Sequence, residues 1–359
     1  MGWYRESGAD RPFGNLLAAH GVAMEGYFWR FTLLDGRALI ALAGVNRAGP
    51  LPRDRSSASA IFGPSEQHWA TLGLAAYPGG TLFQAEHPTG AADPHGLGVV
   101  AGDAFRGWAD ELHVHLSPDA RIDATILAPR PWPRARFGGS SIFQTVPSLN
   151  QYWHPWLLGG TARGSAVVGG EVWNLDGASV YAEKNWGRGG FPESWWWGQA
   201  QAFDDGTDAC VAFAGGQVHA GPLRTEVTGL VVLLPDGTLL RLGNPGTSPV
   251  RARVADEEWL LHGRSGRWEV EVRADAPLDD AHVLPVPLPA ERRNVPGAIE
   301  HLGGRMRVRV RRGGRTVWQA TSNTAGLEHG GLDRAAAELA RREAAERDGA
   351  ERDGAGRDA

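Results

Sequence analysis

Short apolar segments separated by glycine and proline make up most of the chain. In Arg305–Arg312, the apolar residues Met306, Val308 and Val310 alternate with arginines. This two-residue period is typical of an antiparallel strand with one buried face. Residues 267–273 repeat the pattern. The chain therefore contains many strands and few helices, which favours a barrel or a sandwich. Further strands are expected at Gly26–Leu34, Ala38–Val45, Leu72–Ala76, Gly98–Val100, Glu111–Leu116, Ile122–Leu127, Gly229–Leu234, Thr238–Leu242 and Thr316–Thr321.

Turns and one helix complete the predicted elements. Asp-Gly pairs at 35–36 and 236–237 stand between apolar runs and predict hairpin turns. Only Gly331–Arg347 has apolar residues at helical spacing, including Leu332, Ala335 and Leu339. The charged, glycine-containing repeat at 345–359 is expected to be a frayed, solvated tail.

Composition narrows the classes of protein. The chain has 359 residues, of which 42% are hydrophobic, and a formal net charge of −5, which argues against nucleic-acid binding. Cys210 is the only cysteine, so no intrachain disulfide is possible. We expect Cys210 to be a small core residue on a strand. The first thirty residues show no signal-peptide pattern, and no run approaches the roughly 20 apolar residues of a membrane-spanning helix. We expect a cytoplasmic protein, with peripheral membrane contact and the oligomeric state left open.

The most informative stretch runs from Tyr181 to Phe203. Residues 180–186 and 194–203 read as two strands joined by a Gly/Pro turn, which predicts a hairpin. Alternation places Tyr181, Glu183 and Asn185 on one face of the first strand, with Lys184 and Trp186 on the other. On the second strand, one face carries a glutamate, two indoles and two amides, at residues 193, 195, 197, 199 and 201. Such a face suits the wall of a ligand cavity.

The residue types in this stretch indicate acid chemistry. A carboxylic acid in an apolar pocket has a raised pKa and keeps a proton near neutral pH. Indole faces such as those of Trp195 and Trp197 stabilise cations. Together they are suited to protonating an alkene and holding the resulting carbocation, although a cavity that only binds a ligand would use a similar wall. Lys184 is the only lysine in the chain.

Motifs for other chemistry are weak. The sequence contains no P-loop and no Gly-x-Ser-x-Gly elbow. His113 and His115 share a strand face, but two histidines without further ligands are more typical of a solvent-facing strand than of a metal site. We therefore expect no metal and no cofactor.

The run from Tyr181 to Pro192, followed by Trp195–Trp197, resembles the signature of the tocopherol cyclase family. Three other stretches resemble family segments in the same order, at residues 24–30, 153–164 and 321–332. The resemblance spans nearly the whole chain to about residue 332, and its most specific part is the Glu-Lys-Asn-Trp-Gly block at 183–187.

The resemblance implies an all-β fold of two lipocalin-like antiparallel barrels, related to those of carotenoid 1,2-hydratases. The barrels are expected at residues 1–165 and 166–332, followed by a helix and a charged, disordered tail at 333–359. It also implies cofactor-free chemistry, in which a prenyl double bond is protonated and a phenol oxygen closes a ring.

We therefore predict an enzyme that cyclises a prenylated quinol or another isoprenoid. Glu183 is the expected general acid, Asn185 orients the acid or the substrate hydroxyl, and Lys184 is included in the catalytic group. Because Lys184 lies on the opposite face, we expect it to pair with a buried carboxylate such as that of Glu25. The residues expected to bind substrate are Tyr181, Trp186, Trp195, Trp197, Gln199, Glu25, Trp29, Trp153 and Glu328.

Three alternatives stay open. The Glu-Lys-Asn triplet is nearly as well explained by a salt-bridged clamp between domains. Glu25, Glu193 and Glu328 are alternative acids. Two other functions fit the sequence: a non-catalytic isoprenoid carrier, and a cyclase that templates a pericyclic ring closure.

Overall fold

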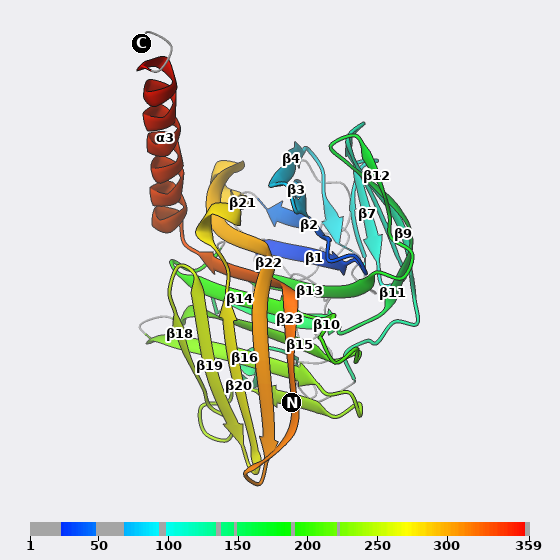
Figure 1. Ribbon diagram of the computed structural model, residues 1–359, viewed down its shortest axis with the longest axis vertical. Coiled ribbons are helices and arrows are strands. Elements are labelled where there is room, and N and C mark those ends of the chain that lie inside the picture. Colours follow the sequence, from blue (N-terminus) through cyan, green and yellow to red (C-terminus); the bar gives the residue numbers. More distant parts are fainter. Residues whose placement is uncertain are drawn as a thin grey trace, which may run out of the picture.

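The computed structural model describes residues 23–47, 68–92, 98–133, 138–146, 149–187, 191–220 and 223–355. These residues form two antiparallel sheets and one C-terminal helix (Figure 1). The expectation of a mostly β protein is confirmed. The strand pairings of the described residues do not show either sheet closing into a barrel, so that part of the expectation stays a prediction.

The first sheet runs in the order β4-β3-β2-β1-β13-β11-β9-β8-β7-β6-β5, with β10 beside β13 and β12 beside β11. Its strands are β1 (Met24–Thr32), β2 (Ala38–Arg47), β3 (His68–Tyr77), β4 (Thr81–His87), β5 (Ala91–Ala92), β6 (Gly98–Ala101), β7 (Phe105–Trp108), β8 (Glu111–Ser117), β9 (Ala120–Leu127), β10 (Gln151–Leu157), β11 (Thr161–Val168), β12 (Glu171–Asn174) and β13 (Ser179–Gly187).

The second sheet runs in the order β17-β16-β15-β14-β23-β22-β20-β19-β18, with β21 beside β22. Its strands are β14 (Trp195–Ala200), β15 (Cys210–Ala220), β16 (Leu223–Leu233), β17 (Leu239–Leu242), β18 (Val250–Val254), β19 (Glu258–Ser265), β20 (Trp268–Asp275), β21 (His282–Leu288), β22 (Arg293–Arg312) and β23 (Arg315–Gly330). Within the described residues, three short 3-10 helices lie between strands, namely η1 (Ser141–Thr145), η2 (Leu278–Asp280) and η3 (Pro289–Glu291).

The predicted hairpin between residues 180 and 203 is wrong. β13 pairs with β1, β10 and β11, whereas β14 pairs with β15 and β23, so the two strands belong to different sheets. The chain changes sheet between Gly187 and Trp195, and residues 188–190 of the Gly-rich turn lie outside the described residues. A change of sheet is not by itself a domain boundary, so the division predicted at residue 165 stays a prediction.

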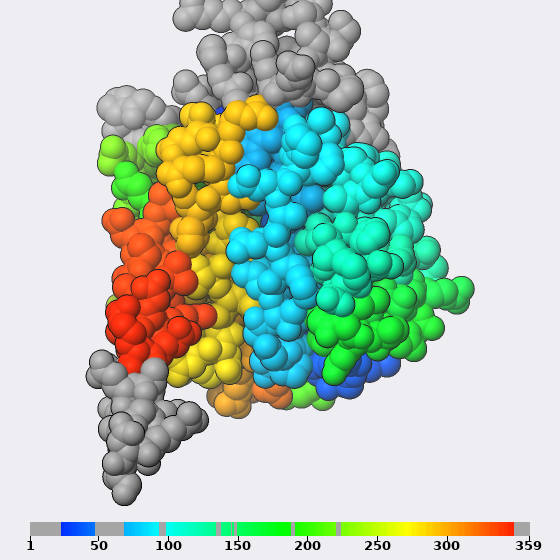
Figure 2. All heavy atoms as spheres, turned by 90° about the horizontal axis from the view of Figure 1, so that it is seen from above, coloured from blue at the N-terminus to red at the C-terminus, as the bar shows by residue number. Residues whose placement is uncertain are grey.

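Each sheet has its own apolar core, and two further clusters join the sheets. Trp29 and Phe105, on β1 and β7, pack with ring centroids 5.8 Å apart inside the first sheet. Between the sheets, Ile40 packs with Trp195, and Tyr181 with Trp197. In Figure 2 the β21–β22 segment (yellow) lies directly beside β3 and β4 (blue), in agreement with the contacts between β21 and β3. One face of these strands therefore packs in the core of its own sheet, and the opposite face packs against the other sheet.

The terminal helix α3 (Leu332–Ala355) extends away from the sheets (Figure 1). It is longer than predicted, because the charged repeat expected to fray is helical up to Ala355. Alanine, glutamate and arginine are strong helix formers, and Glu343 and Arg347 form an i,i+4 ion pair. Among the described residues, no helix has the length and apolar character needed to cross a membrane.

Candidate active site between the two sheets

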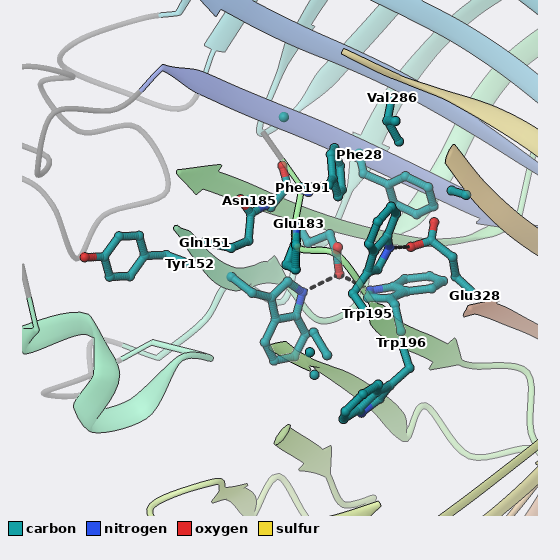
Figure 3. A pocket seen from close by; sticks show the side chains of 18 of the residues that line it. Phe28, Gln151, Tyr152, Glu183, Asn185, Phe191, Trp195, Trp196, Val286 and Glu328 are labelled. Atoms are coloured by element: carbon teal, nitrogen blue, oxygen red, sulfur yellow. Dashed lines mark hydrogen bonds between the residues drawn. The ribbon is translucent and has the colours of Figure 1, made fainter. Parts of the chain in front are cut away.

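A cavity of about 180 Å³ lies between the sheets. Strands β1, β2, β10 and β13 line it from the first sheet, and β14–β16 and β21–β23 line it from the second (Figure 3). Three carboxyl groups reach it, those of Glu183, Glu300 and Glu328. The rest of the lining is largely aromatic, with rings from Tyr27, Phe28, Phe143, Tyr152, Trp153, Phe191, Trp195, Trp196 and Trp197.

Strand alternation decides which side chains reach this cavity. On β13, Val180 and Ala182 point into the core of the first sheet, so Tyr181, Glu183 and Asn185 point toward the second sheet. On β14, Trp196 packs in the core of the second sheet, and Trp195 and Trp197 point toward the first. The predicted faces are confirmed for β13 and β14, whereas Glu193 precedes β14, is exposed and does not line the cavity. The two faces meet across the gap between two sheets rather than within one hairpin.

Glu183 is the most heavily hydrogen-bonded carboxylate in the cavity. Its Oε2 accepts hydrogen bonds from Trp153 Nε1 at 2.8 Å, Tyr181 Oη at 2.5 Å and Trp197 Nε1 at 2.7 Å. Trp197 belongs to the second sheet, so this oxygen joins the two sheets. No described residue donates to Oε1, which leaves Oε1 as the oxygen that can carry a proton.

Burial and hydrogen bonding act on Glu183 in opposite directions. Burial disfavours the charged form, whereas the three donors favour it. Burial has the larger effect and raises the pKa of Glu183 from 4.5 to about 7, with a further small rise from nearby Glu328. The side chain therefore exists in both protonation states near neutral pH, as a general acid requires.

Lys184 lies on the other face of β13, outside the cavity. Its Nζ forms an ion pair with Glu25 Oε1, and both side chains are about 2% exposed or less. The ammonium also lies 5.4 Å from the ring centre of Tyr27 and 5.2 Å from that of Trp186. The predicted pairing with Glu25 is confirmed. This position separates Lys184 from the cavity, so nothing in the geometry supports its inclusion in the catalytic group.

Two amide oxygens form a second polar region of the cavity. Asn185 Oδ1 and Gln151 Oε1 are buried, line the cavity and accept no hydrogen bond from the described residues. Gln151 pairs with Gly187 and Trp153 with Asn185, so the two amides are diagonal neighbours on one face. At Gly26 a Cβ atom would come within 2.2 Å of Asn185 Oδ1, so this glycine makes room for the amide. The site can therefore accept hydrogen bonds from a ligand hydroxyl.

Glu328 and Glu300 form the third polar region, on the second sheet. The two residues are directly opposite each other on β23 and β22. Trp195 Nε1 donates to Glu328 Oε1. Burial raises the pKa of both carboxyl groups, and for Glu300 the pKa lies well above its usual range. Glu328 was expected from the sequence, whereas Glu300 was not, because its only local signal is a charge in the apolar segment 298–302.

The remaining predicted residues divide into two groups. Glu183, Asn185, Trp153, Trp195, Trp197 and Glu328 line the cavity. Tyr181 is fully buried behind Glu183, and Gln199 accepts a hydrogen bond from Arg30 Nη1 at 3.2 Å. Trp29 belongs to the core of the first sheet, and Trp186 stacks on Tyr152 with ring centroids 5.4 Å apart. None of Tyr181, Trp186, Gln199, Glu25 and Trp29 lines the cavity. Cys210 is a buried core residue, as predicted.

Fold and site together define a mostly β protein with a carboxylic acid held in an aromatic cavity. The chain belongs to the tocopherol cyclase-like family, whose model matches residues 135–331. This confirms the resemblance seen in the sequence.

Named relatives match about half of the chain. A probable chloroplastic tocopherol cyclase of Oryza sativa subsp. japonica is 29% identical over 193 residues, which are 51% of this chain and 40% of that protein. The chain thus spans less than half the length of this relative.

Solved structures resemble the chain more widely. A structure of CghA with Sch210972 has a TM-score of 0.50 and 13% identity, covering 87% of this chain and 89% of that one. Kievitone hydratase from Nectria haematococca has a TM-score of 0.49 and 12% identity, covering 91% of this chain and 92% of that one. At such identity the CghA likeness shows the fold alone.

Proposed function

We propose that this protein is an enzyme that cyclises a prenylated quinol, or a related isoprenoid with a free hydroxyl, by protonating its double bond. The observation that carries the proposal is Glu183, a buried carboxyl with a pKa of about 7 on the wall of an aromatic cavity. Membership of the tocopherol cyclase-like family supports the same chemistry.

The proposed reaction begins with Glu183. Its Oε1 gives a proton to one carbon of the double bond, and a carbocation forms at the other carbon. The three donors at Oε2 stabilise the carboxylate that remains. The indole rings of Trp195 and Trp197 offer π faces to the cation. The substrate hydroxyl oxygen then bonds to the cation and loses its proton, so the net reaction is an isomerisation.

The amide pair orients the substrate in this proposal. Asn185 Oδ1 and Gln151 Oε1 accept hydrogen bonds, so the quinol hydroxyl that does not take part in ring closure satisfies them. Asn185 is two residues from Glu183 on the same strand face, which places the hydroxyl about 7 Å along the strand from the acid. This spacing leaves room for a prenyl chain to fold back toward the ring.

Three further proposals concern the shape of the sheets, the location of the protein and its partner. We propose that each sheet curves into a lipocalin-like barrel, that the protein acts in the cytoplasm or at a membrane surface, and that its partner is a small hydrophobic substrate. An experimental structure with a bound isoprenoid, and fractionation of cells that express the chain, test these points.

The test of catalysis uses a prenylated hydroquinone in deuterated buffer. We expect a cyclised product that carries deuterium at the protonated carbon. Glu183→Gln keeps the shape of the side chain but cannot supply the proton, so turnover falls by about 10²–10⁴-fold while binding persists. Glu193→Gln is the matched control, because Glu193 is an exposed glutamate close to β14 and does not line the cavity.

Other outcomes separate the rival functions. A cyclised product without deuterium indicates a pericyclic reaction. Binding without turnover in the wild type and in Glu183→Gln indicates a carrier. Either result contradicts the proposal.

A further inference from the structure

The acid mechanism gives no role to one pair of carboxyl groups in the cavity. Glu300 and Glu328 face each other on neighbouring strands of the second sheet, and both line the cavity. Glu300 is fully buried and Glu328 is half-buried, whereas acidic residues are almost never fully buried unless they are paired. A pair of acids inside the substrate cavity therefore needs an explanation.

Their surroundings show how this pair is held. Glu328 accepts a hydrogen bond from Trp195 Nε1. Neither carboxyl oxygen of Glu300 accepts a hydrogen bond from a described residue, and the residue directly opposite it on the neighbouring strand is Glu328. Two carboxyl groups held opposite each other in a cavity repel when both are ionised, and they can share a hydrogen bond when one carries a proton. The donor from Trp195 favours the charged form at Glu328, and the proton therefore lies on Glu300.

Three more ionisable groups lie around the pair. Arg30 on β1 is fully buried and favours a negative charge on Glu300. Its guanidinium is fixed in place by the backbone carbonyl of Leu302 at 2.8 Å and by Thr32 Oγ1 at 2.6 Å. Glu183 on β13 disfavours that charge. His282, opposite Glu300 on β21, is kept neutral by burial, which lowers its pKa. One negative charge on the pair is balanced by one arginine.

In Figure 3 the ring of Trp195 lies between the carboxyl groups of Glu183 and Glu328. The cavity thus presents an acid on one sheet and a pair of acids on the other, with an aromatic wall between them. Ring closure needs two proton transfers, one to the double bond and one from the hydroxyl. The two sites match these two transfers.

We propose that Glu300 and Glu328 share one proton and act as the base of the reaction, taking the proton that the substrate hydroxyl releases as the ring closes. This role rests on the proposed function. The O–H bond breaks, the new C–O bond forms, and the pair passes from one shared proton to two. Glu183 has by then lost one proton. Return of a proton from the pair to Glu183 resets the site, so nothing is consumed.

The first test needs no substrate. Protein labelled with ¹³C at the glutamate side-chain carboxyl carbon is titrated by NMR, and Glu300→Gln and Glu328→Gln assign the two signals. We expect one protonated carboxyl at pH 7 from this pair, and a changed titration of each partner when the other is replaced. Two independent signals, both ionised at pH 7, would overturn the proposal. If the variants do not fold, the number of protonated glutamates in the wild type still decides, because sharing requires at least one besides Glu183.

The second test uses the prenylated hydroquinone in deuterated buffer. We expect Glu328→Gln to slow ring closure by about a hundredfold while still placing deuterium in the prenyl chain of uncyclised product. Glu183→Gln, by contrast, should place none. Glu269→Gln, at a half-buried glutamate on β20 that does not line the cavity, serves as the control. Normal ring closure in Glu328→Gln, or complete loss of deuterium, contradicts the role as base. If the wild type itself cyclises nothing, the proposed function fails, and the NMR titration still decides whether the proton is shared.

Discussion

The two faces of β13 place two buried ionisable side chains, one residue apart in sequence, in opposite situations. Lys184 lies in a closed core and forms an ion pair with Glu25. Glu183 lies at a cavity and has hydrogen-bond donors but no cation beside it. A buried charge with a fixed counter-ion keeps its charge and holds structure. A buried acid with donors alone stays close to the balance between its two forms, which is the condition for proton transfer.

The largest expected effect comes from removing the buried ion pair between Lys184 and Glu25. Lys184→Met removes the ammonium that is paired with the buried Glu25 carboxylate, so we expect the free energy of unfolding to fall by roughly 3–5 kcal/mol. Chemical denaturation measures this loss. The double variant Lys184→Met/Glu25→Leu should recover most of it. By contrast, Glu183→Gln should leave stability at pH 7 unchanged or raised, because a neutral amide avoids the cost of burying a charge. Equal losses at both positions would contradict the comparison.

The second effect is the pH dependence of stability. Because the pKa of Glu183 is raised from 4.5 to about 7 by folding, the folded state binds a proton that the unfolded state has lost between these values. This contribution to stability is complete below pH 4.5 and disappears as the pH rises through 7. It amounts to about 3 kcal/mol at most. Unfolding measured from pH 4 to 8 should therefore be less pH-dependent in Glu183→Gln than in the wild type. Parallel curves for the two proteins would show that Glu183 has an ordinary pKa.

The smallest effect concerns the donors at the open face. Trp197→Phe keeps a ring in place but removes one hydrogen bond that lowers the pKa of Glu183, so this pKa should rise. The change appears as a shift of the Glu183 titration to higher pH in ¹³C NMR. Trp195→Phe is the matched control, since its indole donates to Glu328 instead. A larger shift in Trp195→Phe than in Trp197→Phe would reverse the assignment of the two donors.

Local periodicity predicted much of this site. A period of two was enough to place Glu183 and Lys184 on opposite faces and to put Trp195 and Trp197 on the cavity side. The same reasoning failed for the hairpin, because pairing between strands far apart in sequence depends on the whole sheet. β13 pairs with β1, about 150 residues earlier, in preference to its neighbour β14.

Residue type alone also could not separate core from cavity. Trp29 and Trp153 are both buried tryptophans, yet only Trp153 reaches the site. Glu300 was missed for a related reason. It becomes significant only through its partner Glu328, and the two meet because β22 and β23 form a long hairpin in which they are opposite each other.

The hydrogen bond between Trp197 and Glu183 crosses from one sheet to the other, and this has a consequence for ligand size. A ligand wide enough to push the sheets apart would lengthen that hydrogen bond. Because the carboxylate would lose a donor, the pKa of Glu183 would rise and Glu183 would become a weaker acid. A narrower ligand would leave this hydrogen bond and the pKa of Glu183 unchanged. The width of the bound molecule would therefore change the pKa of Glu183, and with it the ease of proton transfer to the ligand.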